Sequence, residues 1–115
     1  MTYTGGCHCG KIRFEVDGEI GPVVDCNCSL CKKRGGLLWF VPRANLRLLT
    51  AVSDLGTYTF NKHAIHHHFC MTCGISPFSE SADADKPMSA AVNVRCLDGV
   101  DLSSLVVTPY DGLNH

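Results

Sequence analysis

Cysteine constrains this chain more than any other residue type, because it supplies eight of the 115 residues. Seven of the eight stand in close groups, which are Cys7-His8-Cys9, Cys26-x-Cys28-x-x-Cys31 and Cys70-x-x-Cys73. Two cysteines in a C-x-C pair are poorly placed to form a disulfide with each other. Residues 1–6 lack the basic start and apolar centre of a signal peptide, which predicts a reducing, cytoplasmic location. Metal binding is therefore the better interpretation of the cysteines.

The first and last groups predict a closed zinc site. A structural zinc takes four ligands, usually thiolates that two tight turns offer in pairs. Cys7 and Cys9 form one pair, Cys70 and Cys73 form the other, and a glycine follows each pair. A zinc held by all four would close a long loop and remove much entropy from the unfolded chain. The alternative is four free cysteines in the core.

The middle group predicts a zinc site of a different kind. Cys26, Cys28 and Cys31 offer three thiolates within six residues, and no fourth cysteine stands at a matching distance. Three protein ligands with one exchangeable position are typical of a catalytic zinc. The alternative is a closed site that Cys96 or a histidine completes.

Cys96 and the histidines are the remaining candidate ligands. Cys96 shares the apolar face of a period-2 run with Met88, Ala90, Val92 and Val94. A free cysteine in such a place behaves as a small hydrophobic residue, so we predict that Cys96 is not a zinc ligand. On a predicted strand, His66 and His68 share the face of Cys70, so one of them can stand near a metal or substrate. The alternative is that they are partly exposed strand histidines.

A basic run, Lys32-Lys33-Arg34, directly follows the middle cysteine group. A zinc with three thiolates carries a net negative charge, so nearby cations would offset it and could bind a substrate carboxylate. A solvated charge run explains the same residues equally well.

The rest of the sequence predicts one all-β domain over residues 1–115, with seven or eight short strands. Alternating or continuous apolar residues mark strands near 12–16, 23–24, 37–41, 46–48, 58–60, 65–70, 88–96 and 105–107. Helix signals are weak. We expect one turn over Asn27–Arg34, ended by Gly35, and another that begins at Asp101.

Charge and hydropathy exclude some kinds of partner. Ten basic residues face eleven acidic ones, and the net charge is −1, so the sequence predicts no nucleic-acid partner. The longest apolar stretch, Leu37 to Val41, is too short to cross a bilayer, so we predict no membrane association.

The order of these motifs resembles the family of glutathione-dependent formaldehyde-activating enzymes, which includes the centromere protein V domain. The matching segments are Gly6-Cys7-His8-Cys9-Gly10, Cys26 to Cys31 with Gly35, Phe69 to Gly74, and Asn93 to Gly99. The resemblance implies small antiparallel sheets in a tent-like arrangement around zinc. It also implies two zinc ions per chain, one structural on Cys7, Cys9, Cys70 and Cys73, and one catalytic on Cys26, Cys28 and Cys31.

The resemblance further implies a reaction, the joining of glutathione and formaldehyde as S-hydroxymethylglutathione. We therefore expect a zinc-dependent carbon–sulfur lyase that acts on the adduct of a small thiol, glutathione being the first candidate. The alternative is a non-catalytic, zinc-stabilised module that binds a protein partner.

Overall fold

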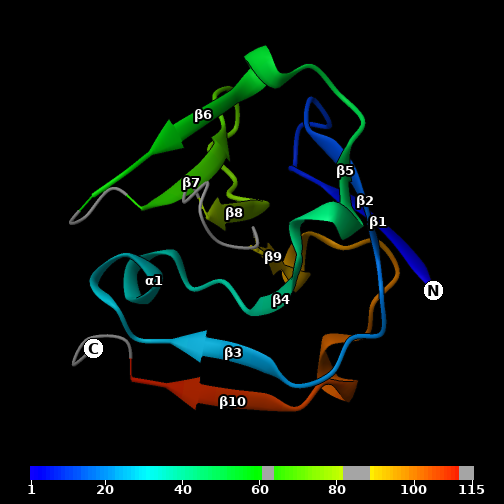
Figure 1. Ribbon diagram of the computed structural model, residues 1–115, viewed down its shortest axis with the longest axis vertical. Helices are drawn as coiled ribbons and strands as arrows, with labels where there is room; N and C mark the ends of the chain where they lie inside the picture. Colours follow the sequence, from blue (N-terminus) through cyan, green and yellow to red (C-terminus); the bar gives the residue numbers. More distant parts are fainter. Residues whose placement is uncertain (61–63, 82–88, 112–115) are drawn as a thin grey trace.

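The protein is described by a computed structural model that covers residues 1–60, 64–81 and 89–111 (Figure 1). Its strands are β1 (Thr2–Gly6), β2 (Arg13–Asp17), β3 (Val23–Cys26), β4 (Leu38–Pro42), β5 (Leu46–Leu48), β6 (Leu55–Tyr58), β7 (Ile65–Cys70), β8 (Phe78–Ser81), β9 (Ser89–Asn93) and β10 (Val107–Tyr110). One α-helix, α1 (Ser29–Arg34), and four 3₁₀ turns complete the described residues. The 3₁₀ turns are η1 (Arg43–Asn45), η2 (Val52–Asp54), η3 (Val94–Cys96) and η4 (Leu102–Ser104). The all-β prediction is confirmed.

The smaller sheet has the order β1-β2-β5. The predicted alternation holds in β2, where Phe14 and Val16 are fully buried between polar neighbours. The sequence did not predict β1, because Thr2 to Gly6 are mostly small residues without apolar alternation. This strand forms through its antiparallel pairing with β2, from Thr2 opposite Asp17 to Gly6 opposite Arg13.

The larger sheet has the order β10-β3-β4-β9-β8-β7-β6, and it runs from the bottom to the top of Figure 1. Every pair in it is antiparallel except β10 with β3, which is parallel. This edge is thus the one exception, among the described strand pairs, to the antiparallel pairing that the sequence predicted. More than 80 residues separate the two strands in sequence, so no hairpin dictates their relative direction.

The two sheets share one hydrophobic core. Phe14 and Leu46 from the smaller sheet pack with Trp39, Val92 and Phe78 from the larger one. The radius of gyration is 13.4 Å, close to the roughly 13 Å expected for a compact domain of this length. No helix in the described ranges is long and apolar enough to span a bilayer.

The predicted period-2 run through Cys96 is shorter than expected. Strand β9 ends at Asn93, and η3 takes over at Val94. The side chain of Asn93 accepts a hydrogen bond from the backbone N–H of Arg95 and so caps the 3₁₀ turn. Cys96 therefore does not continue the face of Val92, although it still packs against the core. Met88 lies outside the described residues.

The two helix predictions are confirmed as short turns. Helix α1 ends at Gly35, whose φ of 72° gives the left-handed conformation that ends many helices. Asp101 caps η4 through its side chain.

Two strands differ from the prediction. The last strand, β10, begins at Val107 rather than at Leu105. Strand β8 was not predicted, because Pro77 and the serines around Phe78 obscure its pattern.

Candidate metal centres and the adjoining cavity

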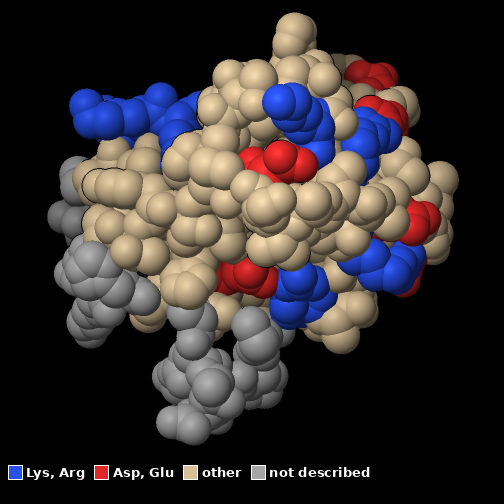
Figure 2. All heavy atoms as spheres, turned by 90° about the horizontal axis from the view of Figure 1, so that it is seen from above, with Lys and Arg blue, Asp and Glu red and all other residues tan. Residues whose placement is uncertain are grey.

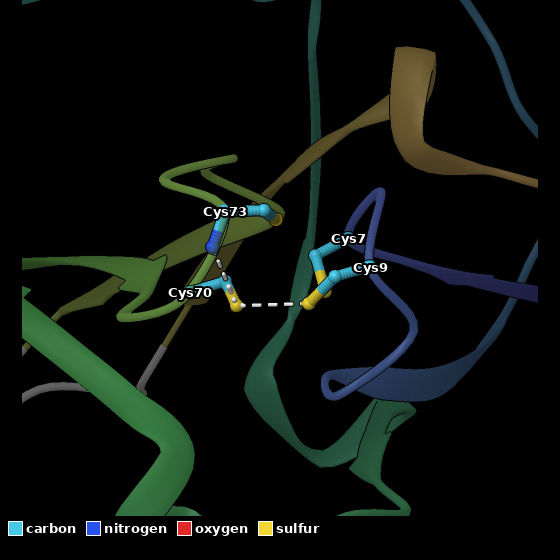
Figure 3. A group of neighbouring side chains, drawn as sticks. All are labelled: Cys7, Cys9, Cys70 and Cys73. Carbon is cyan, nitrogen blue, oxygen red and sulfur yellow. Dashed lines mark hydrogen bonds between the residues drawn. The ribbon is translucent and has the colours of Figure 1, made fainter.

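The four-cysteine cluster joins two segments that are far apart in the sequence. Cys7 and Cys9 lie in the loop after β1, whereas Cys70 ends β7 and Cys73 lies in the turn after it (Figure 3). Their four sulfur atoms lie within 4.8 Å of one another. The structure thus brings together the four residues that the sequence predicted as one ligand set.

The distances in this cluster suit a zinc ion. The Sγ atom of Cys9 lies 3.6 Å from that of Cys7 and 3.6 Å from that of Cys70. Four thiolates bonded tetrahedrally at about 2.3 Å would be about 3.8 Å apart. Backbone N–H groups also point at the sulfurs, from Ile12 to Cys7 at 3.3 Å and from Thr72 to Cys70 at 3.4 Å. These donors favour thiolate over thiol.

The pKa values of Cys73 and Cys9 show why ionisation of this whole cluster needs a bound cation. Backbone N–H groups, first that of Ile75 and then that of Cys9, lower the pKa of Cys73 to about 6. The N–H of Lys11 also lowers the pKa of Cys9, but burial and the neighbouring thiols outweigh it and raise that pKa to about 11. Closely packed thiolates repel one another, so all four can ionise together only with a cation between them.

The three-cysteine cluster is built by the turn from β3 into α1. Cys26 ends β3, Cys28 is the N-cap of α1, and Cys31 lies in the helix. Their sulfur atoms lie within 4.8 Å of one another. The Cys28 sulfur accepts the N–H of Cys31 at 3.3 Å, and the Cys26 sulfur accepts that of Cys28 at 3.4 Å. The cap of the helix therefore fixes the direction of all three thiols.

Cys28 and Cys31 differ in acidity. Burial opposes ionisation of Cys28, but hydrogen bonds from the backbone and thiol of Cys31 prevail and lower its pKa. Burial first, and then the Cys28 thiol, raise the pKa of Cys31. The donor set, three sulfurs with one acidified thiol, fits a soft or borderline metal such as zinc.

Neither cluster includes Cys96 or a histidine among the described residues. The Cys96 thiol points at the carbonyl oxygen of Ser76, 3.9 Å away. Burial raises the pKa of this thiol to about 11, so it stays protonated at neutral pH. That Cys96 is not a zinc ligand stays a prediction, since only a metal-loaded structure tests it.

A cavity of about 230 Å³ adjoins the three-cysteine cluster, and Cys26 and Cys31 form part of its wall. Helix α1 and strands β4, β7, β8 and β9 provide the other sides. Its apolar lining comes from Leu30, Leu38, Phe40, Ile65, Phe78 and Ala91. The polar side chains that face it include Arg34, His67, Ser76, Glu80 and Asn93. Sequence reasoning missed this cavity, since its lining residues are scattered from position 26 to position 93.

Of the described histidines, His67 lines this cavity, and not His66 or His68 as the strand pattern indicated. His68 is only 6% exposed, so the expectation of a partly exposed strand histidine is wrong for it. Its ring bonds to Glu80 Oε1 at 2.7 Å and to Thr57 Oγ1 at 3.0 Å, which leaves neither nitrogen for a metal. Burial, and then the charge of Arg34, lower the pKa of His67, so its imidazole is neutral at neutral pH.

Of the basic run, Arg34 lines the cavity, and Lys32 and Lys33 do not. The Nη1 atom of Arg34 donates to Ser76 Oγ at 2.8 Å, and the Ser76 hydroxyl donates to the carbonyl of His68 at 2.7 Å. Glu80 is the acidic residue among the described residues that line the cavity. Its bonds to His68 and Arg43 lower the pKa of this carboxyl to about 2, so it is ionised at neutral pH.

On the face shown in Figure 2, most basic side chains lie beside acidic ones, and uncharged residues cover the larger area. This face gives no support to nucleic-acid binding. The absence of such a partner stays a prediction.

Comparison with known proteins supplies the family. Residues 2–106 match the profile described as glutathione-dependent formaldehyde-activating enzyme. The chain belongs to this family. A crystal structure of a protein from Rhodobacter sphaeroides is also similar, with 30% sequence identity and a TM-score of 0.78. The match covers 91% of this chain and 99% of that one. All seven grouped cysteines and the cavity lie inside the segment that matches the family.

Proposed function

We propose that this member of the formaldehyde-activating family is a zinc-dependent carbon–sulfur lyase that makes or cleaves the adduct of a small thiol and an aldehyde. Glutathione and formaldehyde are the first candidates, because the family is described by them. The observation that carries the proposal is the three-cysteine cluster at the wall of a cavity. A site with three protein ligands leaves one position for a substrate.

Two zinc ions have separate places in this proposal. Cys7, Cys9, Cys70 and Cys73 would hold a structural ion, since four thiols complete a tetrahedron. Cys26, Cys28 and Cys31 would hold a catalytic ion. Zinc bound there would supply a Lewis acid that favours the thiolate form of a substrate thiol at neutral pH.

His67 is the residue we assign to proton transfer. In the forward direction the thiol sulfur bonds to the aldehyde carbon, and the π electrons of the carbonyl move to its oxygen. The thiol proton must then reach that oxygen, and a neutral imidazole in the cavity wall can accept it and pass it on. The reverse reaction uses the same steps backwards. No oxidant or reductant is needed, since the atoms and electrons of thiol and aldehyde balance those of the adduct.

Exchange NMR of glutathione with formaldehyde tests the proposal, because thiols add to formaldehyde without a catalyst and the protein-free rate is the baseline. We expect the zinc-loaded protein to exceed this rate and Cys28→Ser to return it to the baseline. His67→Gln should lower the enzymatic rate about 10²-fold, the low end for general acid–base catalysis. His66→Gln is the matched control and should leave the rate unchanged, since His66 does not line the cavity.

A wild-type rate equal to the protein-free rate, for glutathione and for other small thiols, would contradict the enzymatic proposal. It would favour the alternative of a non-catalytic protein-interaction module.

A further inference from the structure

We propose that the cavity selects a small thiol that carries a carboxylate a few bonds from its sulfur, and that Arg34 binds this carboxylate. The inference rests on the proposed function, since it takes the substrate sulfur to lie at the open side of the three-cysteine cluster. It narrows the substrate class from thiols in general to short mercapto acids.

The position of Arg34 relative to the cluster sets the length of the ligand. Arg34 follows Cys31 by three residues on α1, and both side chains line the cavity. Residues three apart on a helix have Cβ atoms about 5–6 Å from each other. The two side chains thus lie on one side of α1 and face one cavity of about 230 Å³, so a ligand that reaches both groups spans only the length of this small cavity.

The guanidinium of Arg34 is held in place with hydrogen-bond donors to spare. Ser76 Oγ accepts from Nη1 at 2.8 Å, and its own proton is committed to the His68 carbonyl at 2.7 Å. The serine thus acts as a fixed acceptor. One bond to a neutral hydroxyl uses one of five N–H donors, and the planar group can still bind a carboxylate through two parallel bonds.

Within the described part of the chain, Arg34 differs from three other arginines in that it has no carboxylate partner. Arg13 pairs with Asp98, Arg43 with Glu80, and Arg47 with Asp17. Among the described residues, no carboxylate oxygen lies within 4.0 Å of the Arg34 guanidinium. Glu80 lines the same cavity, but its two oxygens are bonded to His68 and Arg43. A cation in a largely apolar cavity favours an anionic ligand.

The size of the cavity favours a small ligand. Its volume of about 230 Å³ lies below the 300–1,000 Å³ typical of sites for drug-sized ligands. A short mercapto acid places one carboxylate on Arg34 and its apolar methylenes against the aliphatic wall. Glutathione brings two carboxylates, whereas Arg34 is the one lysine or arginine among the described lining residues, so a second carboxylate would have no such partner.

Arg34 would also offset the negative charge of the metal-loaded cluster. The experiment must distinguish this role from carboxylate binding. Charge compensation predicts weaker metal binding when Arg34 is replaced, with no preference among thiols. Carboxylate recognition predicts the opposite pattern, a changed preference among thiols at unchanged metal content.

Calorimetric titration of the zinc-loaded protein with three matched thiols tests the inference. The probes are 3-mercaptopropionate, 3-mercapto-1-propanol and cysteamine, which share a short chain and differ in charge. We expect 3-mercaptopropionate to bind about tenfold more tightly than the alcohol, as a charge-assisted hydrogen-bonded pair would give. Arg34→Gln should remove this ratio and Arg34→Lys should keep part of it. Lys33→Gln is the matched control and should leave it unchanged.

Four other outcomes of these titrations would each contradict one specific claim. Equal affinity of the wild type for the acid and the alcohol would overturn the inference and leave the proposed function standing. Binding of none of the thiols, glutathione included, would overturn the proposed function itself. Loss of zinc from Arg34→Gln with an unchanged affinity ratio would show charge compensation and overturn the carboxylate role. Tighter binding of glutathione than of 3-mercaptopropionate would overturn the assignment to short acids.

Discussion

Gly5 shows at the scale of one residue how closely the two sheets of this protein meet. It forms an isolated antiparallel bridge with Leu97, which follows η3 at the end of β9. A Cβ atom at Gly5 would lie 2.6 Å from the carbonyl oxygen of Cys96 and 2.9 Å from the ring of Phe14. Only glycine lets the chain of β1 approach this backbone, just before it reaches Cys7.

Gly5→Ala should therefore destabilise the protein by about 1–3 kcal/mol, the usual cost of overpacking a buried site. Gly21→Ala is the matched control, because a Cβ there meets nothing within 4 Å. Urea unfolding of both variants in the zinc-loaded form measures the difference. Equal stability of the two variants would contradict the close approach at Gly5.

At the scale of elements, a polar network ties β6, β7 and β8 together beside the cavity. Thr57 of β6 bonds to the ring of His68 in β7, and the same ring bonds to Glu80 of β8. Arg43 bonds to the second oxygen of Glu80 and donates to the carbonyl of Leu46 at 2.6 Å. No described buried side-chain nitrogen or oxygen lacks a hydrogen-bond partner. The fold tolerates a buried histidine and carboxylate here because the two side chains form a hydrogen bond with each other.

The network predicts a pH dependence of stability. The carboxyl pKa of Glu80 falls from 4.5 to about 2 on folding, chiefly through the hydrogen bond to His68. A lowered folded-state pKa stabilises the fold above the unfolded value, and this contribution disappears as the pH falls from about 4.5 to about 2. The free energy of unfolding should thus differ between wild type and Glu80→Gln at pH 6, and the difference should shrink between pH 4.5 and 2.

Urea unfolding at several pH values measures this difference. Acid also removes zinc from thiolates, so the two proteins are compared only at pH values at which elemental analysis shows that both retain their zinc. A difference that stays constant over this pH range would show that Glu80 is not held ionised by its partners.

The sequence predicted some of these elements and missed others for physical reasons. The alternation of Phe14 and Val16 indicated β2, because one face of that strand is buried and the other is not. Strand β9 is different, since Ala90, Ala91 and Val92 are all buried, and a period-2 pattern carries less information there. The end of this strand was also missed, because the local cap at Asn93 overrides the apolar pattern.

At the scale of the whole molecule, the four-cysteine cluster joins the two sheets. It links the loop after β1 in the smaller sheet to the end of β7 in the larger one, and 61 residues separate Cys9 from Cys70. The three-cysteine cluster spans one local turn and closes no long loop. A metal ion bound by all four thiols would close that long loop, so loop-closure entropy would give the first cluster the larger part in stability.

This difference predicts unequal effects of two matched substitutions. Cys73→Ser should lose one zinc and the cooperative unfolding transition, because a structural zinc contributes folding free energy that a small core cannot replace. Cys28→Ser should lose one zinc but keep the fold. Elemental analysis and thermal unfolding followed by circular dichroism measure both.

Cys96→Ser is the control for these substitutions and should bind two zinc ions per chain, the number that we expect for the wild type. Equal destabilisation by Cys73→Ser and Cys28→Ser, or loss of zinc from Cys96→Ser, would contradict the proposed roles of the two clusters.

The sequence by itself determined the two cysteine pairs and the group of three, because the spacing of cysteines within one tight turn fixes how close their sulfur atoms lie. Tertiary structure brings the two pairs together, because they lie 61 positions apart. The sequence also determined the all-β class, through alternation along single strands. Tertiary structure decided which other residues meet these thiols. The choice of His67 over His68, and of Arg34 over its two lysine neighbours, depends on the direction each side chain takes from its strand or helix. For His67 that direction follows from the register of β7 with β6 and β8, which depends on pairing between separate strands.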